Sequence, residues 1–134
     1  MHSDTRLTTL DEVPSPPLPD GAGVMTVLVE IPPGSRGTPP HRHSGPVFGY
    51  LTEGRMTFEL EGEAPRAINP GEAFSEPGGE VVHWQAANAL DDCWTRFIAV
   101  MTCAPGAPML TYLDDDEIAR LQHRRHPSVR GTEV

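Results

Sequence analysis

The 134-residue sequence contains no lysine, and all ten of its basic residues are arginine. Lysine Schiff-base chemistry and phosphate binding by a P-loop are therefore excluded. The sequence also lacks any apolar run near the roughly 20 residues that a membrane-spanning helix needs. Its first residues do not contain the apolar segment of a signal peptide. We therefore expect a cytoplasmic protein that does not insert into a membrane.

Positive charge and cysteine are both scarce. The 19 acidic residues outnumber the ten arginines, so the formal net charge is -9. Such a surface repels phosphate groups, and neither a nucleic acid nor an anionic membrane is an expected partner. Cys93 and Cys103 lie mostly within one extended apolar stretch, which would hold them too far apart for a disulfide. We expect both to be reduced thiols.

Glycine and proline, by contrast, are abundant, with 13 and 15 residues dispersed along the chain. Residues 1–20 are polar, contain several prolines and show no helical period, which predicts an extended N-terminal arm. Residues 21–113 contain short apolar or alternating segments about every 8–12 residues, separated by glycine-rich turns. This spacing is typical of an antiparallel β-barrel or sandwich.

Individual strands and one helix can be assigned within this pattern. Residues 24–31 are almost all apolar or β-branched, which predicts a strand covered on both faces. Residues 47–51 and 56–60 are predicted to form a hairpin through a Thr-Glu-Gly-Arg turn. Residues 114–126 begin with aspartates and end with arginines, which predicts one helix, and residues 127–134 are expected to form a tail. Further strands are predicted at residues 66–68, 73–76, 81–85 and 94–102.

Histidine is the concentrated source of chemistry in the sequence. His41 and His43 form an HxH pair, and on a strand these two side chains point to the same face. Their bases would lie ~6–7 Å apart, which two imidazoles can span to reach one metal ion. His83, on a separate predicted strand, would complete a face of three nitrogen ligands with open positions for water or substrate.

The residues around these histidines resemble the two motifs of the cupin superfamily. The first motif is matched by Gly34, His41, His43 and Gly54, and the second by Gly71, Pro77, Gly79, His83 and Asn88, with one-residue differences in spacing. The resemblance covers roughly residues 24–103. It implies an all-β cupin β-barrel or double-stranded jelly roll, here with one short C-terminal helix, and usually a dimer. We therefore expect a homodimer in which the N-terminal arm or the strand at residues 24–31 packs on the partner.

The first motif departs from the cupin pattern at its metal-binding glutamate. Val47 occupies that position, and no Asp, Glu, Gln or His lies between residues 44 and 52. The resemblance therefore implies an all-histidine site, similar to those of thiol dioxygenases and diketone-cleaving cupins. It would hold one divalent transition metal ion: iron, zinc, manganese, nickel or copper. The alternative is a cupin that has lost its metal together with the glutamate.

Three imidazoles would leave a divalent ion its full charge and open positions for a substrate and O2. The first interpretation is therefore an oxygenase that acts on a small, partly apolar molecule. A redox-neutral isomerase, cyclase or lyase and a non-catalytic binding or sensing cupin remain open alternatives.

Other side chains could take part at this site. Glu76, if it points inward, is a candidate general base or hydrogen-bond partner of a histidine. Val47, Gly49 and Leu51 alternate on one face, which the cupin resemblance implies is the inner one, and with Phe58 they are the candidate substrate pocket. Gly49 would either leave space beside the metal or mark a β-bulge.

Overall fold

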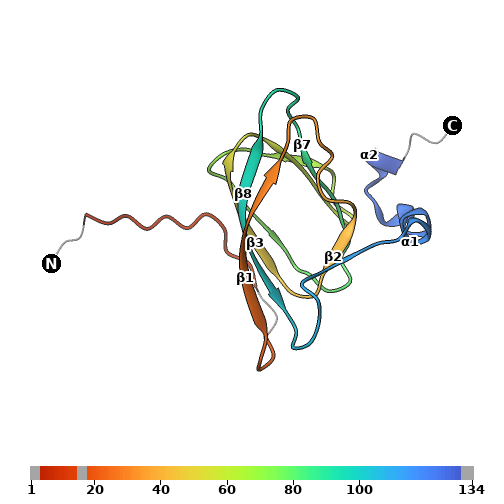
Figure 1. Cartoon of the computed structure of the whole chain (residues 1–134), viewed down its shortest axis with the longest axis horizontal. Coiled ribbons are helices and arrows are strands. Elements are labelled where there is room, and N and C mark those ends of the chain that lie inside the picture. Colours follow the sequence, from red (N-terminus) through yellow and green to blue (C-terminus); the bar gives the residue numbers. More distant parts are fainter. Residues whose placement is uncertain (1–3, 15–17, 131–134) are drawn as a thin grey trace.

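The computed structural model describes residues 4–14 and 18–130 of the chain. Within them, two antiparallel sheets enclose one core (Figure 1). The four-stranded sheet has the order β1 (Gly23–Ile31), β8 (Thr95–Cys103), β3 (Val47–Glu53) and β6 (Ala73–Glu76). The five-stranded sheet has the order β5 (Arg66–Ile68), β4 (Met56–Leu60), β7 (His83–Asn88), β2 (His41–His43) and β9 (Leu110–Tyr112). The expected all-β barrel is confirmed.

Alternating side chains from both sheets build the core. Along β3, Val47, Gly49 and Leu51 are buried while Phe48 and Tyr50 are exposed. The inward residues of β4, β6 and β8 meet them, so the core joins the two sheets. Its members are Ile31, Val47, Leu51, Met56, Phe58, Leu60, Ile68, Phe74, Ala86, Phe97 and Ala99. The alternation of apolar residues that predicted these strands therefore corresponds to the alternation of buried and exposed side chains.

The predicted hairpin of residues 47–51 and 56–60 is wrong, because β3 and β4 belong to different sheets. The turn between them leads the chain from one sheet to the other. Gly54 has a φ of 83°, and a Cβ at this position would collide with Thr95. The buried Thr95 hydroxyl accepts a hydrogen bond from Arg55 N and donates one to Arg55 O, which fixes this corner. A glycine-containing turn of this length is thus compatible with a corner as well as a hairpin.

The strand predicted at residues 24–31 is present as β1, but it is not covered on both faces. It lies at the edge of its sheet, and its outward side chains Val24 and Leu28 are 63% and 55% exposed. Apolar composition alone does not distinguish a strand between two layers from an edge strand whose outer face is exposed.

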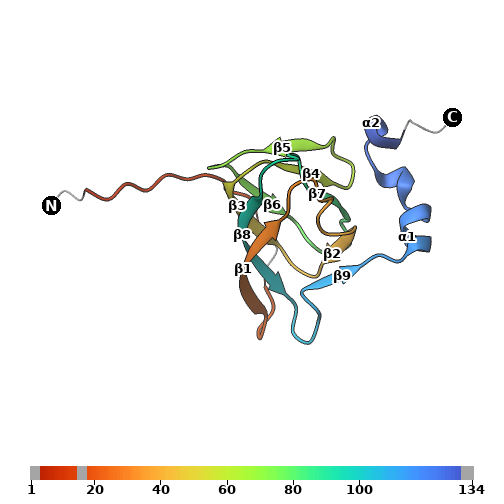
Figure 2. The same cartoon turned by 45° about the horizontal axis from the view of Figure 1, so that its top comes forward.

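The C-terminal segment folds against the outside of the five-stranded sheet (Figure 2). Helix α1 (Asp115–Arg120) begins with a capping box formed by Asp114 and Glu117. A 3-10 turn, η1 (Gln122–Arg124), follows, and α2 (Pro127–Arg130) lies in the predicted tail. The one helix expected at residues 114–126 is therefore interrupted. An apolar cluster of Val82, Trp84, Leu113, Ile118 and Leu121 attaches the segment to the sheet.

The N-terminal arm leaves the barrel on the side opposite the C-terminal helices (Figures 1 and 2). Residues 4–14 have no strand or helix and are exposed, with Leu7 at 96%. Residues 1–3 and 15–17 of the predicted arm, and residues 131–134 of the predicted tail, lie outside the described residues. Within the described part of the chain, no helix has the length and apolar character needed to cross a membrane.

Candidate metal centre

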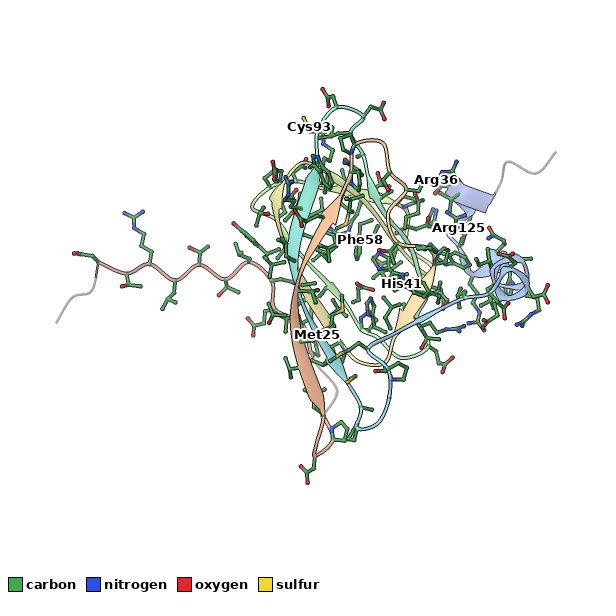
Figure 3. The ribbon with its side chains drawn as sticks, viewed as in Figure 1. Met25, Arg36, His41, Phe58, Cys93 and Arg125 are labelled. Carbon is green, nitrogen blue, oxygen red and sulfur yellow. The ribbon has the colours of Figure 1, made fainter. Side chains whose placement is uncertain are left out.

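Strands β2 and β7 bring the three predicted histidines together. His41 and His83 are directly opposed in the β2–β7 ladder, and His43 lies two residues beyond His41 on the same face. All three are at most 4% exposed. The ring centroids of His41 lie 4.8 Å from those of both His43 and His83. Figure 3 shows His41 inside the barrel. Because residues two apart on a strand point to the same face, both imidazoles of the HxH pair lie next to the imidazole of His83.

A carboxylate completes this cluster from the opposite sheet. Glu76 on β6 is 6% exposed, and its Oε1 lies 3.1 Å from His83 Nδ1 and 3.5 Å from His43 Nε2. One ligating atom from each of His41, His43, His83 and Glu76 can be chosen so that all four lie within 4.8 Å of one another. Ligands held at ~2.1 Å by one transition metal ion are themselves roughly 3–4 Å apart. The four residues therefore fit one ion with small side-chain movements.

The expected all-histidine composition is not confirmed, because Glu76 belongs to the same cluster. Glu76 is directly opposed to Val47 in the β3–β6 ladder. Opposed residues in an antiparallel pair place their side chains on the same face. The carboxylate that the cupin motif expects at Val47 is thus offered by its neighbour across the ladder. In the sequence, Glu76 lies two residues after the apolar Phe74, and on a strand both side chains share a face, which is the inner one here; this spacing does not indicate which residue lies opposite Glu76.

A backbone hydrogen bond selects the tautomer of His41. Its Nδ1 donates to the Pro39 carbonyl oxygen at 2.7 Å, which leaves Nε2 without a proton. That Nε2 lies 3.1 Å from His43 Nε2, so the two atoms face the same point. Partners of this kind orient imidazoles toward metals in proteins. The loop before β2 therefore prepares His41 as a ligand through Nε2.

The protonation states of the cluster suit a cation. Burial, followed by the proximity of His83, lowers the pKa of His41 to about 4. Burial also lowers the pKa of His43. Burial alone would raise the pKa of Glu76, but His83 and the other two imidazoles outweigh it and lower the pKa. His41 and His43 are thus neutral at pH 7 and Glu76 is charged, as metal ligands must be.

Unpartnered polar atoms are concentrated at the same place. Among the described residues, His43 Nδ1 and both ring nitrogens of His83 are buried without a hydrogen-bond partner; the His83 Nδ1–Glu76 contact lacks hydrogen-bond geometry. Buried polar atoms of folded proteins are almost always satisfied. The His83 Nδ1 among these atoms lies 3.1 Å from Glu76, so a cation bound at the cluster could satisfy it, and this observation supports the metal assignment.

A cavity of about 40 Å³ adjoins the cluster. Its walls are mostly apolar and include Val47, Phe74, Phe97 and Ala99. A volume of ~10–15 Å³ suffices for one water molecule, so the cavity admits an ion and a few atoms of a ligand. Half-buried residues form its outward side: Val29, Thr38, Met101 and Leu110. A larger substrate would have to displace some of these side chains.

The four residues predicted to line the substrate pocket occupy different places. Val47 lines the cavity. Leu51 and Phe58 are core residues, and the Phe58 ring centroid lies 4.8 Å from that of His83. Gly49 does not leave open space, because the Phe74 ring fills the position where its Cβ would be. A substrate-binding role for these residues stays a prediction.

Sequence comparison agrees with this architecture. Residues 27–101 match the family model of the cupin domain. This chain belongs to the cupin domain family. The match spans β2, β3, β6 and β7, and so includes the three histidines, Val47 and Glu76. No curated protein matches the sequence of this cupin.

Several solved structures resemble this cupin. The polyketide cyclase RemF from Streptomyces resistomycificus is 27% identical, with 74% of this chain and 68% of that one covered and a TM-score of 0.51. An RmlC-like cupin family protein from Methanocaldococcus jannaschii is 25% identical, and the match covers 61% of this chain and 70% of that one with a TM-score of 0.50. The DMSP lyase DddQ from Ruegeria pomeroyi DSS-3 is 20% identical, with 66% and 42% covered and a TM-score of 0.54, and shows the fold alone.

Proposed function

We propose that this cupin is a metal-dependent enzyme that acts on a small, largely apolar organic molecule. The observation that carries the proposal is the buried cluster of His41, His43, His83 and Glu76 beside an apolar cavity. Burying four such groups in a small barrel costs free energy unless a cation binds them. These ionisable groups are gathered at one point of the core, as is typical of a functional site.

The four residues would hold one divalent ion of iron, zinc, manganese, nickel or copper, all of which accept imidazole. Such an ion polarises bound carbonyl or enolate oxygens, and redox-active ions also support oxygen chemistry. The protein itself contributes a fixed His41 tautomer, a charged carboxylate and apolar walls that exclude water. These walls strengthen every charge interaction within the site.

We infer that the reaction is redox-neutral, such as a cyclisation or an isomerisation. The expectation of an oxygenase depended on three neutral ligands, whereas Glu76 reduces the charge of the site by one unit when it ligates. A Glu76 that leaves the ion can instead accept a proton from the substrate. The likeness to a polyketide cyclase supports this class. Oxygenation is the second candidate, favoured by the apolar cavity walls, which suit O2.

Metal content tests the proposal. Protein purified without a His-tag and without added metal should contain close to one transition metal ion per chain, measured by elemental mass spectrometry. His41→Ala and His83→Ala should each remove most of it, whereas His123→Ala, at an exposed histidine, should not. Circular dichroism would verify that the variants are folded. Unchanged metal content in both cluster variants would overturn the proposal.

Oxygen dependence separates the two reaction classes. Candidate β-diketones and poly-β-ketones would be incubated with the metal-loaded protein in air and under anaerobic conditions. A redox-neutral enzyme should consume its substrate equally in both, with no O2 uptake at an oxygen electrode. Turnover that requires O2 would instead identify an oxygenase.

A further inference from the structure

A second and much larger pocket lies outside the barrel. It has a volume of about 640 Å³ and is enclosed by the outer face of the five-stranded sheet, the loop before β2 and the C-terminal segment. Pockets for small organic molecules typically measure roughly 300–1,000 Å³. The outer pocket is therefore large enough for a whole organic molecule as it stands, whereas the 40 Å³ metal cavity would first have to widen by movement of the half-buried side chains on its outward side.

The sheet separates this pocket from the metal cluster. On β7, His83 faces the metal cavity, whereas Trp84 and Gln85 line the outer pocket together with Arg125 of the C-terminal segment. Among the described residues, only Thr38 lines both the outer pocket and the metal cavity. A ligand of the outer pocket would therefore not touch the cluster.

The outer pocket is positively charged, although the chain as a whole carries -9. Arg36 and Arg125 line it, and no Asp or Glu does. Figure 3 shows both arginines on the side of the barrel next to the C-terminal helices. The buried Glu59 neutralises Arg125 through contacts of 2.6 and 2.8 Å. Arg36 has no ion pair within the described ranges, so its charge is available to a ligand.

The remaining residues that line the outer pocket are apolar or contribute one polar atom each. Pro39, Pro40 and Ile118 are apolar. Trp84 is 4% exposed, and its Nε1 has no hydrogen-bond partner in the described part of the chain. Gln85 donates its amide to Glu59, which leaves its side-chain oxygen as an acceptor. The combination of one free cation with an aromatic and aliphatic wall suits an organic anion better than an inorganic one.

We propose that this outer pocket is a binding site for a small organic anion that has a planar apolar body and one carboxylate. The carboxylate pairs with Arg36, and the apolar body packs on Pro39, Pro40 and Ile118, beside the nearly buried Trp84 side chain. The site does not depend on the metal cluster, and the proposal stands independently of the enzymatic activity.

Titration of the full-length, metal-containing protein with 2-naphthoate tests this site. The readout is the indole N–H signal of Trp84 in a nitrogen–proton correlation spectrum, assigned with the Trp94→Phe variant, which retains a single tryptophan. The signal should shift and saturate at one 2-naphthoate per chain. The uncharged 2-naphthylmethanol should bind at least about tenfold more weakly, as expected for loss of a charge-assisted contact.

Two arginine variants provide the matched comparison. Arg36→Gln should weaken 2-naphthoate binding about tenfold, whereas Arg120→Gln, at an exposed arginine of α1 outside the pocket, should leave it unchanged. His41→Ala should also bind 2-naphthoate normally, even though it loses metal. Equal binding of the alcohol, equal effects of the two arginine variants, no Trp84 shift, or loss of binding in His41→Ala would each overturn the proposal.

Discussion

Glu76 brings negative charge to the metal cluster from a position directly across the ladder from Val47. Opposed residues of an antiparallel pair have Cβ atoms about 5 Å apart and share a face. A carboxylate at either position can therefore reach the same point in the barrel. The absence of a glutamate in the first motif thus need not change the charge of the site, because the paired strand supplies one.

Moving the carboxylate across the ladder tests this equivalence. Glu76→Gln should lower the affinity for Zn²⁺ by at least ~tenfold, since glutamine keeps the shape of the side chain but loses its charge. The double variant Val47→Glu/Glu76→Val should recover most of this affinity. Chelator-competition titrations would measure both, with thermal unfolding recorded alongside.

The control for this exchange is Glu80→Gln, which neutralises an exposed glutamate near β6 and should not affect the affinity. An unchanged affinity in Glu76→Gln would show that the imidazoles bind the ion without the carboxylate. Loss of affinity in the double variant despite a normal fold would show that position 47 does not face the ion.

The sequence was informative about the three histidines but not about the partner of Glu76. The spacing within an HxH pair and the motif around His83 are local patterns, and both predicted the cluster. The role of Glu76 depends on the register between β3 and β6, which pairs Val47 with a residue 29 positions later. Register between distant strands is decided by packing of the whole core, and no local pattern contains it.

At the scale of elements, the outer face of the five-stranded sheet depends on one buried ion pair. Glu59 on β4 points away from the core, yet it is 0% exposed because the C-terminal segment covers it. Arg125 binds both of its carboxylate oxygens, and Gln85 donates to one of them at 2.7 Å. The short helices α1 and α2 have little stability of their own. Their attachment therefore relies on this pair and on the apolar cluster around Trp84.

Removing the cation should destabilise the protein strongly. Arg125→Met would leave the Glu59 carboxylate buried and unpaired, and we expect the free energy of unfolding to fall by about 3–5 kcal/mol. Arg124→Met is the matched control, because Arg124 lies 3.7 Å from Glu61 in a pair that is partly exposed, and it should cost less than ~1 kcal/mol. Urea denaturation measures both variants. Equal losses would contradict a special role for the Glu59–Arg125 pair.

The positions of most strands and of the first helix could be predicted from the sequence, whereas the pairing of the strands within the sheets could not. Alternation located β3, β4, β5 and β6, and acidic residues located the start of α1. The strand at residues 24–31 was correct, but its exposure was not. The turn at Gly54 looked like a hairpin and is a corner, because β3 pairs with β6 and β8 rather than with β4. The exposure of β1 and the corner at Gly54 both depend on which strands pair across long sequence distances, and amino-acid composition does not predict that pairing.

At the scale of the whole molecule, the outer face of the four-stranded sheet exposes several large apolar side chains. Val24 and Leu28 of β1 and Phe48 and Tyr50 of β3 are between 38% and 63% exposed. Across the ladder, Ile98 lies opposite both Leu28 and Tyr50, so these side chains form one continuous apolar area. Large apolar areas of this kind usually mark interfaces. Burying this apolar area between two copies would offset part of the repulsion between chains that each carry -9.

We therefore expect a homodimer in which two copies of this face pack together, with edge strand β1 in the interface. Light scattering at micromolar concentration should give the mass of two chains. Leu28→Glu would place two like charges in a two-fold interface and should give monomers with an unchanged circular dichroism spectrum.

Leu10→Glu is the control that shows whether the strand or the N-terminal arm forms the interface, because Leu10 lies in the arm and is 55% exposed like Leu28. It should leave the dimer intact, whereas dissociation by Leu10→Glu alone would assign the contact to the arm. A monomer mass for the parent protein would exclude both arrangements.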